Sequence, residues 1–329
     1  MYRMDYSITV GALRLPLLTS VKIKKDVESL MDTATIVAPA VAHGKALAYA
    51  KVVALHQPVS IMLGYDGQLS NEFSGYVSSV VLEDNMLTIE CEDALHLMRL
   101  VPMPDGQLKG VTVTSLLQQV VAKTNAYCSA NGIAGTLTLN CLYSYSYTTF
   151  NFVHATAYDV MEKIQKEGKP NIDIKDGVLR VFPQYTSPDG IAVYSLASNI
   201  CKEGLKLKWR SVTDRKLLVI AKSKGKTGVT LQATAGVAGG DTQKIDFSGI
   251  YDLASLQRIA NETYNHQCFT GYEGSFCSWL VPFVDANYQA RIIDESGLLQ
   301  NGSYYVKSVE TEFSSSGGIR TISLGAGVP

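Results

Sequence analysis

The feature that most limits the fold is a β-hairpin pattern, FSGYVSSVVLEDNMLTIECEDAL, at residues 73–95. Across residues 87–92, Leu, Ile and Cys alternate with Thr and Glu, the two-residue period of a strand with one solvated face. The first arm, YVSSVVL, is rich in β-branched residues, and we expect it to be covered on both faces near Val80. Residues 83–85, Glu-Asp-Asn, supply the turn.

A similar pattern returns near the end of the chain. YVSSVVLE at Tyr76–Glu83 can be laid on YVKSVETE at Tyr305–Glu312, and each segment is followed by a turn and a strand containing Thr-Ile. We predict that the two are copies of one structural unit. The alternative is two unrelated hairpins built from residues that favour strands. The residues that carry the predicted repeat are Tyr76, Val77, Val80, Glu83, Tyr305, Val306, Val309 and Glu312.

Length and charge bound the class of protein. A chain of 329 residues exceeds the size of one hydrophobic core, so we expect several domains. A net charge of −1 gives no general basic field for nucleic acid. The longest apolar run, residues 36–55, contains Pro, His and Lys, so we expect no stable membrane insertion. Without a secretion signal or a C-x-x-C pair, the chain is expected to fold in a cytoplasm with reduced cysteines.

Composition shifts predict three parts. The first, residues 1–105, is all-β and ends at the Pro/Gly-rich VPMPDGQLKG. The second, residues 106–200, is a small α+β unit, and the third, residues 201–329, returns to strands with one helix. We therefore predict a mainly β fold, with two tube-like β-barrel domains flanking an α+β insertion.

Three helices are expected from their periodicity and caps. VTSLLQQVVAKT is predicted to begin at an N-cap, Thr114. TAYDVMEKIQKEG carries a capping box of Thr156 and Asp159, and DLASLQRIANETYN begins behind Asp252. NIDIKDGVLRVFP is a predicted hairpin with Asp176-Gly177 at its turn.

Signals for nucleotide binding are weak. A strand runs into Gly225-Lys226-Thr227 as in a phosphate-binding loop, but Ile220 stands where the motif needs its first glycine. The glycine-rich segment 236–241, GVAGGD, is not G-x-G-x-x-G and is interpreted as a loop.

Signals for other chemistry are equally thin. Glu90 and Glu92 share a strand face with Thr88, which indicates a solvated side of a barrel rather than paired catalytic acids. Trp209 and Trp279 are interpreted as core or interface residues. The histidines are isolated in the sequence and give no metal-ligand spacing: His43, His56, His96, His154 and His266. We predict no catalytic residue, no cofactor and no metal.

In the order of its parts the sequence resembles the tail baseplate hub family of contractile phages. This family includes late-control D-type and Mu-like tail proteins and the hub part of type VI secretion spike proteins. The matching motifs are a Gly-Tyr turn at Gly64-Tyr65, Phe-x-Gly-x-Val at Phe73–Val77, and Gly-x-Tyr-x-Val at Gly302–Val306 before the glycine turn of SSSGGIRTISLG. The Ala-rich segment 36–55 departs from the family pattern.

The resemblance implies a structural role without catalysis. Such a chain forms a homotrimer whose two barrels per copy make a pseudo-hexameric ring between the hexameric tail tube and the trimeric central spike. Its expected partners are further copies of itself, the tube protein, the spike protein and other baseplate proteins, while DNA or an effector passes through the lumen without specific binding. It is expected to assemble in the bacterial cytoplasm and to reside in a virion tail or injection particle. The alternative is a carbohydrate-binding or cell-wall-degrading module of the same machine.

Overall fold

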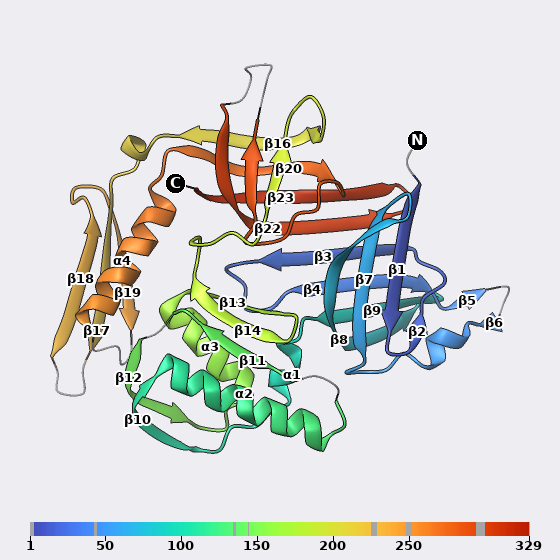
Figure 1. Ribbon diagram of the computed structural model, residues 1–329, viewed down its shortest axis with the longest axis horizontal. Coiled ribbons are helices and arrows are strands. Elements are labelled where there is room, and N and C mark those ends of the chain that lie inside the picture. Colours follow the sequence, from blue (N-terminus) through green and yellow to red (C-terminus); the bar gives the residue numbers. More distant parts are fainter. Residues whose placement is uncertain are drawn as a thin grey trace.

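One long sheet of thirteen strands runs through most of the described chain in the computed structural model (Figure 1). The structure describes residues 3–42, 45–133, 136–143, 145–224, 229–247, 252–293 and 300–328. Strands dominate and a smaller α+β unit lies below the sheet, which confirms the predicted fold class. None of the helices in these ranges is long and apolar enough to cross a bilayer.

The first half of the long sheet curves around a hydrophobic core to which Leu280 and Phe313 of the second half also contribute. Its strands lie in the order β3-β4-β9-β8-β7-β1-β2. A separate pair, β5 (Val41–Ala42) and β6 (Lys45–Ala46), and a 3-10 turn at Ala48–Lys51 follow β4. The bounds of the strands are β1 Met4–Val10, β2 Leu13–Arg14, β3 Ser20–Asp26, β4 Thr33–Pro39, β7 Pro58–Tyr65, β8 Gln68–Glu83 and β9 Met86–Glu92.

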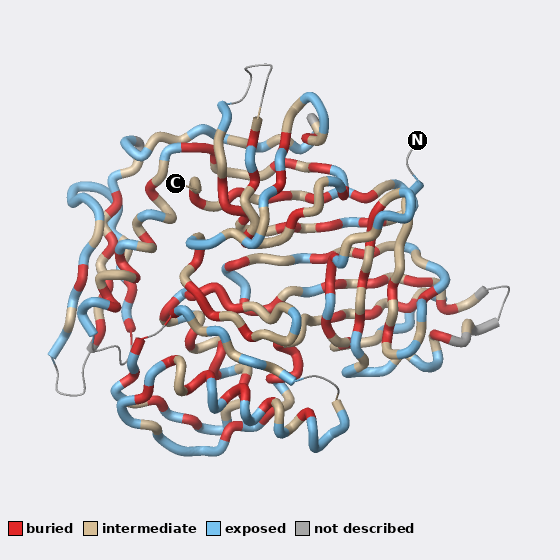
Figure 2. The backbone as a smooth tube through the Cα atoms, in the orientation of Figure 1, coloured by how far each residue is buried: buried red, intermediate tan, exposed pale blue. Residues whose placement is uncertain are grey.

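The hairpin of β8 and β9 forms as its sequence predicts. Leu87, Ile89 and Cys91 are buried, and the polar residues between them are half-buried. Asp84 and Asn85 have positive φ values of 48° and 62°, as a two-residue hairpin turn with the twist of its strands requires. Figure 2 shows such alternation of burial along the strands of the sheet.

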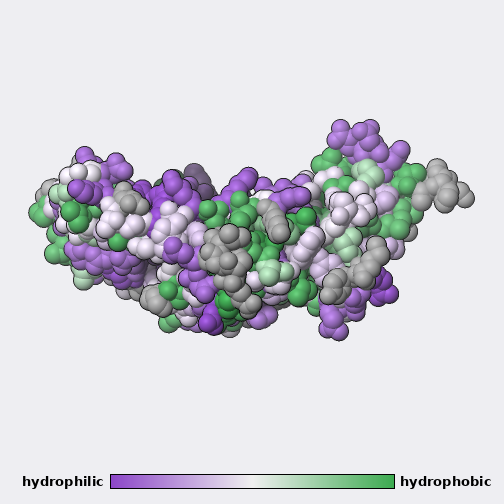
Figure 3. Space-filling view, turned by 90° about the horizontal axis from the view of Figure 1, so that it is seen from above, coloured by the Kyte–Doolittle hydropathy of each residue, from purple (hydrophilic) through white to green (hydrophobic). Residues whose placement is uncertain are grey.

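The second half of the sheet surrounds another core. Its strands follow the order β16-β20-β23-β22, with β21 on β22 and β15 on β21. The ranges are β15 Ile191–Tyr194, β16 Ile200–Arg210, β20 Gly271–Trp279, β21 Gln289–Ile292, β22 Gly302–Ser314 and β23 Gly317–Gly327. Seen from above, where β16 lies, hydrophobic residues are divided into separate patches among hydrophilic ones (Figure 3).

The α+β part contains two groups of elements in one hydrophobic core. The first group, with the short helix α1 leading into it, comprises α1 His96–Arg99, β10 Gly106–Thr112, α2 Val113–Ala130, β11 Thr138–Cys141, β12 Ser146–Phe152, α3 Ala157–Gly168, β13 Pro170–Lys175 and β14 Val178–Pro183. After a 3-10 turn at Val212–Asp214, the second group comprises β17 Leu217–Lys224, β18 Thr230–Gly236, β19 Asp241–Phe247 and α4 Leu253–Gln267. The buried residues of both groups form one cluster.

This core crosses the division predicted from the sequence. β15 begins at Ile191 and its buried residues cluster with those of β20–β23, whereas β17–β19 and α4 cluster with the α+β unit. The guanidinium of Arg258 in α4, for example, lies 4.1 Å from the ring centroid of Tyr143. The three-part division stays a prediction. As an alternative, we propose a second barrel of β15, β16 and β20–β23, with residues 212–268 as an insertion that packs on the α+β unit.

The helix caps were predicted with one error. Thr156 and Asp159 form the expected capping box, and Asp252 accepts hydrogen bonds from the first-turn amides of α4. The N-cap of α2 is Thr112 and not Thr114, because β10 runs straight into the helix and leaves Thr112 extended. Its hydroxyl accepts from the Ser115 amide at 3.1 Å.

A direct strand pairing joins the two halves of the sheet. β22 pairs antiparallel with β3, with Ser308–Ser314 opposite Asp26–Ser20. Figure 1 shows the strands from β16 through β22 to β3 and β4 stacked below one another. On this joint the ammonium of Lys22 forms ion pairs with Glu310 and with Glu312, the latter at 2.8 Å.

Buried charge also links the two halves. Arg320 of β23 has no solvent-exposed surface and forms an ion pair with Glu72 of β8. The same guanidinium donates to the carbonyl oxygens of Leu280 and Pro282 at 2.6 and 2.8 Å. A buried charge without its partner is strongly destabilising, so this pair binds the two halves in one arrangement.

An ion-pair network ties the α+β unit to both barrels. Asp285, in the loop after β20, pairs with Lys25 of β3 at 3.0 Å and with Lys175 of β13 at 3.7 Å. Lys175 also pairs with Asp189 at 2.8 Å. The neighbouring cations lower the pKa of Asp189 to about 2 despite its partial burial, so the network stays ionised near neutral pH.

The Glu72–Arg320 pair generates a stability prediction. Glu72→Leu should cost about 3–5 kcal/mol in free energy of unfolding, because it leaves the Arg320 guanidinium charged in a dry site. Urea denaturation followed by fluorescence measures the shift in midpoint. The matched control is Arg3→Ala, which removes a cation whose side chain is 75% exposed and which should shift the midpoint far less. Equal shifts for the two variants would contradict the role given to the buried pair.

Candidate assembly surface

The residues of the sequence match lie in two hairpins with the same pairing register. The first segment is the second half of β8 and pairs with β9, and the second lies in β22 and pairs with β23. Val80 lies opposite Ile89, and Val309 lies opposite Ile322. At the turn end of each hairpin, Glu83 lies opposite Met86 and Glu312 lies opposite Ile319. Each of these partners comes three residues before the isoleucine of its own strand. From Val77 and Val306 onward, the paired residues that are aligned in the sequence thus have equivalent partners.

Both hairpins also carry a β-bulge at the same place. In β8 the register shifts between Val77 and Ser79, and in β22 it shifts between Val306 and Ser308. Bulges insert one extra residue and redirect the strand, so a shared position is a more specific likeness than shared strand residues. β22 has a second irregularity, just before Val306, that β8 lacks.

The likeness extends to the next two strands of each half. The order β3-β4-β9-β8 in the first half matches β16-β20-β23-β22 in the second. Following the registers across each sheet places Lys22–Lys24 of β3 at the position of Lys206–Lys208 of β16. These segments read KIK and KLK within VKIKK and LKLKW. Both segments have the pattern of a strand, but the sequence alone does not indicate that they correspond.

The predicted repeat residues divide into core and surface positions. Val77, Val306 and Val309 are buried, and so is Tyr305. Tyr76 and Val80 are half-buried, and the remaining two residues, Glu83 and Glu312, lie at the solvated ends of their hairpins. The apolar members therefore hold each barrel together, while the acidic members are available for contacts outside it.

The two hairpins differ in what covers their outer edges. The edge of β22 is paired to β3. β8 pairs with β7 only as far as Tyr76, and no other strand of the described chain pairs with the outer edge of residues 78–83. Likewise β16 pairs only with β20 among the described strands.

The open edge corrects one prediction. The arm YVSSVVL was expected to be covered on both faces near Val80, yet Val81 is 47% exposed and Leu82 is 66% exposed. The apolar pattern was real, but no part of the described chain packs over the end of this strand. Exposed β-branched and aliphatic residues on an unpaired edge are typical of a surface that another chain covers.

The acidic residues of β9 are engaged in local contacts. Glu90 accepts a hydrogen bond from the hydroxyl of Thr35 at 2.7 Å. Glu92 contacts His96 at 2.8 Å, and the hydrogen bond from His96 lowers the pKa of Glu92 despite partial burial. A general acid for glycoside hydrolysis needs a raised pKa, so this environment does not suit Glu92 to that task.

The histidines are less isolated than the sequence suggested. The Nδ1 atom of His56 lies 2.9 Å from Nε2 of His96, because the loop before β7 and the short helix α1 meet beside β8. His154 is exposed near Asp105, and His43 lies outside the described residues. No cluster of three or more potential metal ligands occurs in the described ranges.

The remaining candidates are two glycine-containing segments and two tryptophans. Gly225-Lys226-Thr227 lies outside the described residues, and the glycine-rich segment 236–241 connects β18 to β19. Trp209 and Trp279 are 39% and 48% exposed, with the Trp209 ring packed edge-on against Tyr272.

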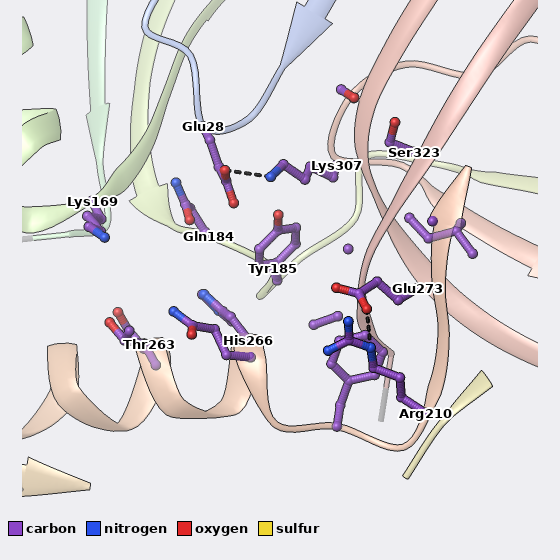
Figure 4. A pocket seen from close by; sticks show the side chains of 18 of the residues that line it. Glu28, Lys169, Gln184, Tyr185, Arg210, Thr263, His266, Glu273, Lys307 and Ser323 are labelled. Carbon is purple, nitrogen blue, oxygen red and sulfur yellow. Dashed lines mark ion pairs between the residues drawn. The ribbon is translucent and has the colours of Figure 1, made fainter. Parts of the chain in front are cut away.

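A cavity of about 860 Å³ lies between α3, α4 and the second barrel (Figure 4). Two ion pairs lie on its wall, Glu28 with Lys307 at 2.6 Å and Arg210 with Glu273. His266 packs edge-on against Tyr185, with ring centroids 4.6 Å apart. Burial lowers the pKa of His266 to about 4, so its imidazole is neutral near pH 7.

Comparison with known proteins places the fold. No family model matches the chain, and no curated protein matches it. A tail protein from Neisseria meningitidis is similar with a TM-score of 0.66 and 15% identity, covering 98% of this chain and 97% of that one. The 43 kDa tail protein of prophage MuSo2 from Shewanella oneidensis gives a TM-score of 0.63 at 14% identity, over 99% and 98% of the two chains.

A secretion component is also similar. It is an Escherichia coli protein of the type VI secretion system, with a TM-score of 0.57 and 10% identity over 98% of this chain and 77% of that one. At these identities the comparisons show that the chain has the fold of phage tail proteins and related secretion components over nearly its whole length.

The cavity generates a pH prediction. Because the unfolded chain binds a proton at His266 near pH 6.5 and the folded chain only near pH 4, the free energy of unfolding should fall as pH is lowered through this window. An imidazole resonance titrating near pH 4 should appear in NMR spectra of the chain and should be absent from His266→Gln. Titration near pH 6.5 would instead indicate a solvated ring able to act as an acid or base.

Proposed function

We propose that this chain is a structural hub of a contractile tail or injection machine. Three copies form a ring of six barrels that joins a hexameric tail tube to a trimeric central spike. The observation that carries the proposal is the likeness of the two halves: four strands in each share their order and register, and the β8–β9 and β22–β23 hairpins share the position of a bulge. A chain with two equivalent barrels presents six of them as a trimer, which matches a sixfold partner on one side and a threefold partner on the other.

The similar structures support the same role. They are named as tail proteins or as a secretion component that itself resembles the T4 phage tail proteins gp27 and gp5. A further similar structure, with a TM-score of 0.54 and 10% identity, is a complex of PdpA and VgrG from Francisella. The partners proposed for this chain are its own copies, a tube protein, a spike protein and other baseplate proteins.

The solvated face of the continuous sheet is suited to a lumen. Acidic Glu90, Glu92 and Glu310 alternate there with basic Lys22 and Lys24. A mixed face holds no strong field of one sign, so DNA or an effector can pass without being held. The chain is proposed to assemble in a bacterial cytoplasm and to act in the tail baseplate without catalysis. Glu90 is bound to Thr35 and Glu92 to His96, and these contacts give no specific support to a cell-wall-degrading module.

Oligomeric state tests the proposal. At micromolar concentration, light scattering should give three times the 35.7 kDa of one chain, and electron microscopy should show a ring with threefold symmetry and six similar lobes. A dimer, or a monomer that adds no ring to assembled particles, would overturn the proposed hub.

A further inference from the structure

Two strand edges lack a partner strand in the described chain, and the duplication relates both to edges that are paired. The outer edge of β8 at residues 78–83 is the counterpart of the edge of β22 that β3 covers. The open edge of β16 at residues 205–210 is the counterpart of the edge of β3 that covers β22. The joint within one chain therefore provides a template for a joint between two chains.

We propose that β8 of one copy pairs antiparallel with β16 of a second copy, in the register of the internal joint. Glu312 lies opposite Lys22 in that joint, and transferring the pairing places Glu83 opposite Lys206. The next pairs along the strands are Leu82 with Leu207, Val81 with Lys208, Val80 with Trp209 and Ser79 with Arg210. This inference deepens the proposed hub, on which it rests, by assigning the residues that join its subunits.

Charge on the two edges fits this register. In the internal joint, Lys22 pairs with Glu312 at 2.8 Å across the strands. Glu83 is exposed at the end of β8, and Lys206 is exposed on the same face of β16 as its counterpart Lys22 on β3. Opposite charges directly across an antiparallel pair stabilise it, and a shift of one residue would place them on opposite faces.

The apolar residues fit as well. Leu82 is the most exposed residue of this arm's apolar set at 66%, and Leu207 is half-buried at the other edge. Their counterparts in the internal joint, Thr311 and Ile23, are both buried. Pairing would bury the aliphatic side chains that a lone copy leaves in water.

A second copy is the occupant that the geometry favours. The two edges complement each other but not themselves, since β8 presents Glu83 and β16 presents Lys206. Such a head-to-tail contact either closes into a ring or continues as a filament. Because the joint within a copy and the joint between copies share one register, each barrel is placed against the next in the same way around the assembly.

Disulfide trapping tests the register. Leu82→Cys combined with Leu207→Cys in the full chain places two thiols directly opposite each other, at a spacing that a disulfide can bridge. Mild oxidation should give covalent dimers and trimers on a non-reducing gel. The matched control, Leu82→Cys with Lys208→Cys, places the thiols on opposite faces of the sheet and should give no more cross-linking than the unaltered chain, whose six cysteines are free.

Charge exchange tests the same contact without oxidation. Glu83→Lys and Lys206→Glu should each reduce the trimer fraction seen by light scattering, and the double variant should restore it. Lys123→Glu on the exposed face of α2 is the control for a charge reversal and should leave the trimer fraction unchanged.

The two proposals fail in different ways. If the unaltered chain forms the threefold ring but the 82–207 pair does not cross-link above its control, the register is wrong and the hub stands. The same holds if the double charge variant is not restored. If the unaltered chain is a dimer, or a monomer that adds no ring to assembled particles, the hub itself fails.

Discussion

The antiparallel pairing of β22 with β3 is the contact on which the rest of the structure depends. It joins residues near the two ends of the chain and makes two curved sheets continuous. Lys22 bridges Glu310 and Glu312 over its solvated side. Nearby, the buried Arg320–Glu72 pair holds the second half against β8. Among these contacts, the strand pairing is the one that makes the sheets of the two barrels continuous.

The same contact explains why the edges of the molecule are built as they are. An unpaired strand edge with exposed aliphatic residues risks aggregation, and proteins commonly place charges there. β8 ends at Glu83, which follows Val81 and Leu82, and Asp84 comes next in the turn. Lysines alternate with other residues along the open side of β16. Two β8 edges repel each other because both are acidic, and two β16 edges repel each other because both are basic. The β8 edge of one copy and the β16 edge of another carry opposite charges.

Local features of this fold could be predicted from the sequence. The alternation in β9, the Asp84–Asn85 turn and the capping box of Thr156 and Asp159 each depend on residues within a few positions of one another. Thr112 was missed because two threonines compete for one cap, and the choice depends on where β10 ends.

Features that depend on contacts between residues far apart in the chain could not be predicted from the sequence. The sequence of residues 212–268 predicts strands and a helix, as do the segments on either side of it. Only the packing of its buried residues shows that it belongs to the α+β core. The correspondence of VKIKK with LKLKW is hidden because alternating lysine and aliphatic residues suit any half-exposed strand. The burial of Arg320 follows from Glu72, which lies in the other half of the chain.

Hydrogen exchange at the two open edges tests the central claim most directly. If equivalent joints close the ring, the backbone amides of residues 79–83 and 206–210 that point away from β9 and β20 should exchange rapidly in dilute monomer. In the assembled particle they should become about as protected as those of the internal β22–β3 joint. Rapid exchange at both edges in an intact ring would contradict the account, because the subunits would then be joined by other surfaces.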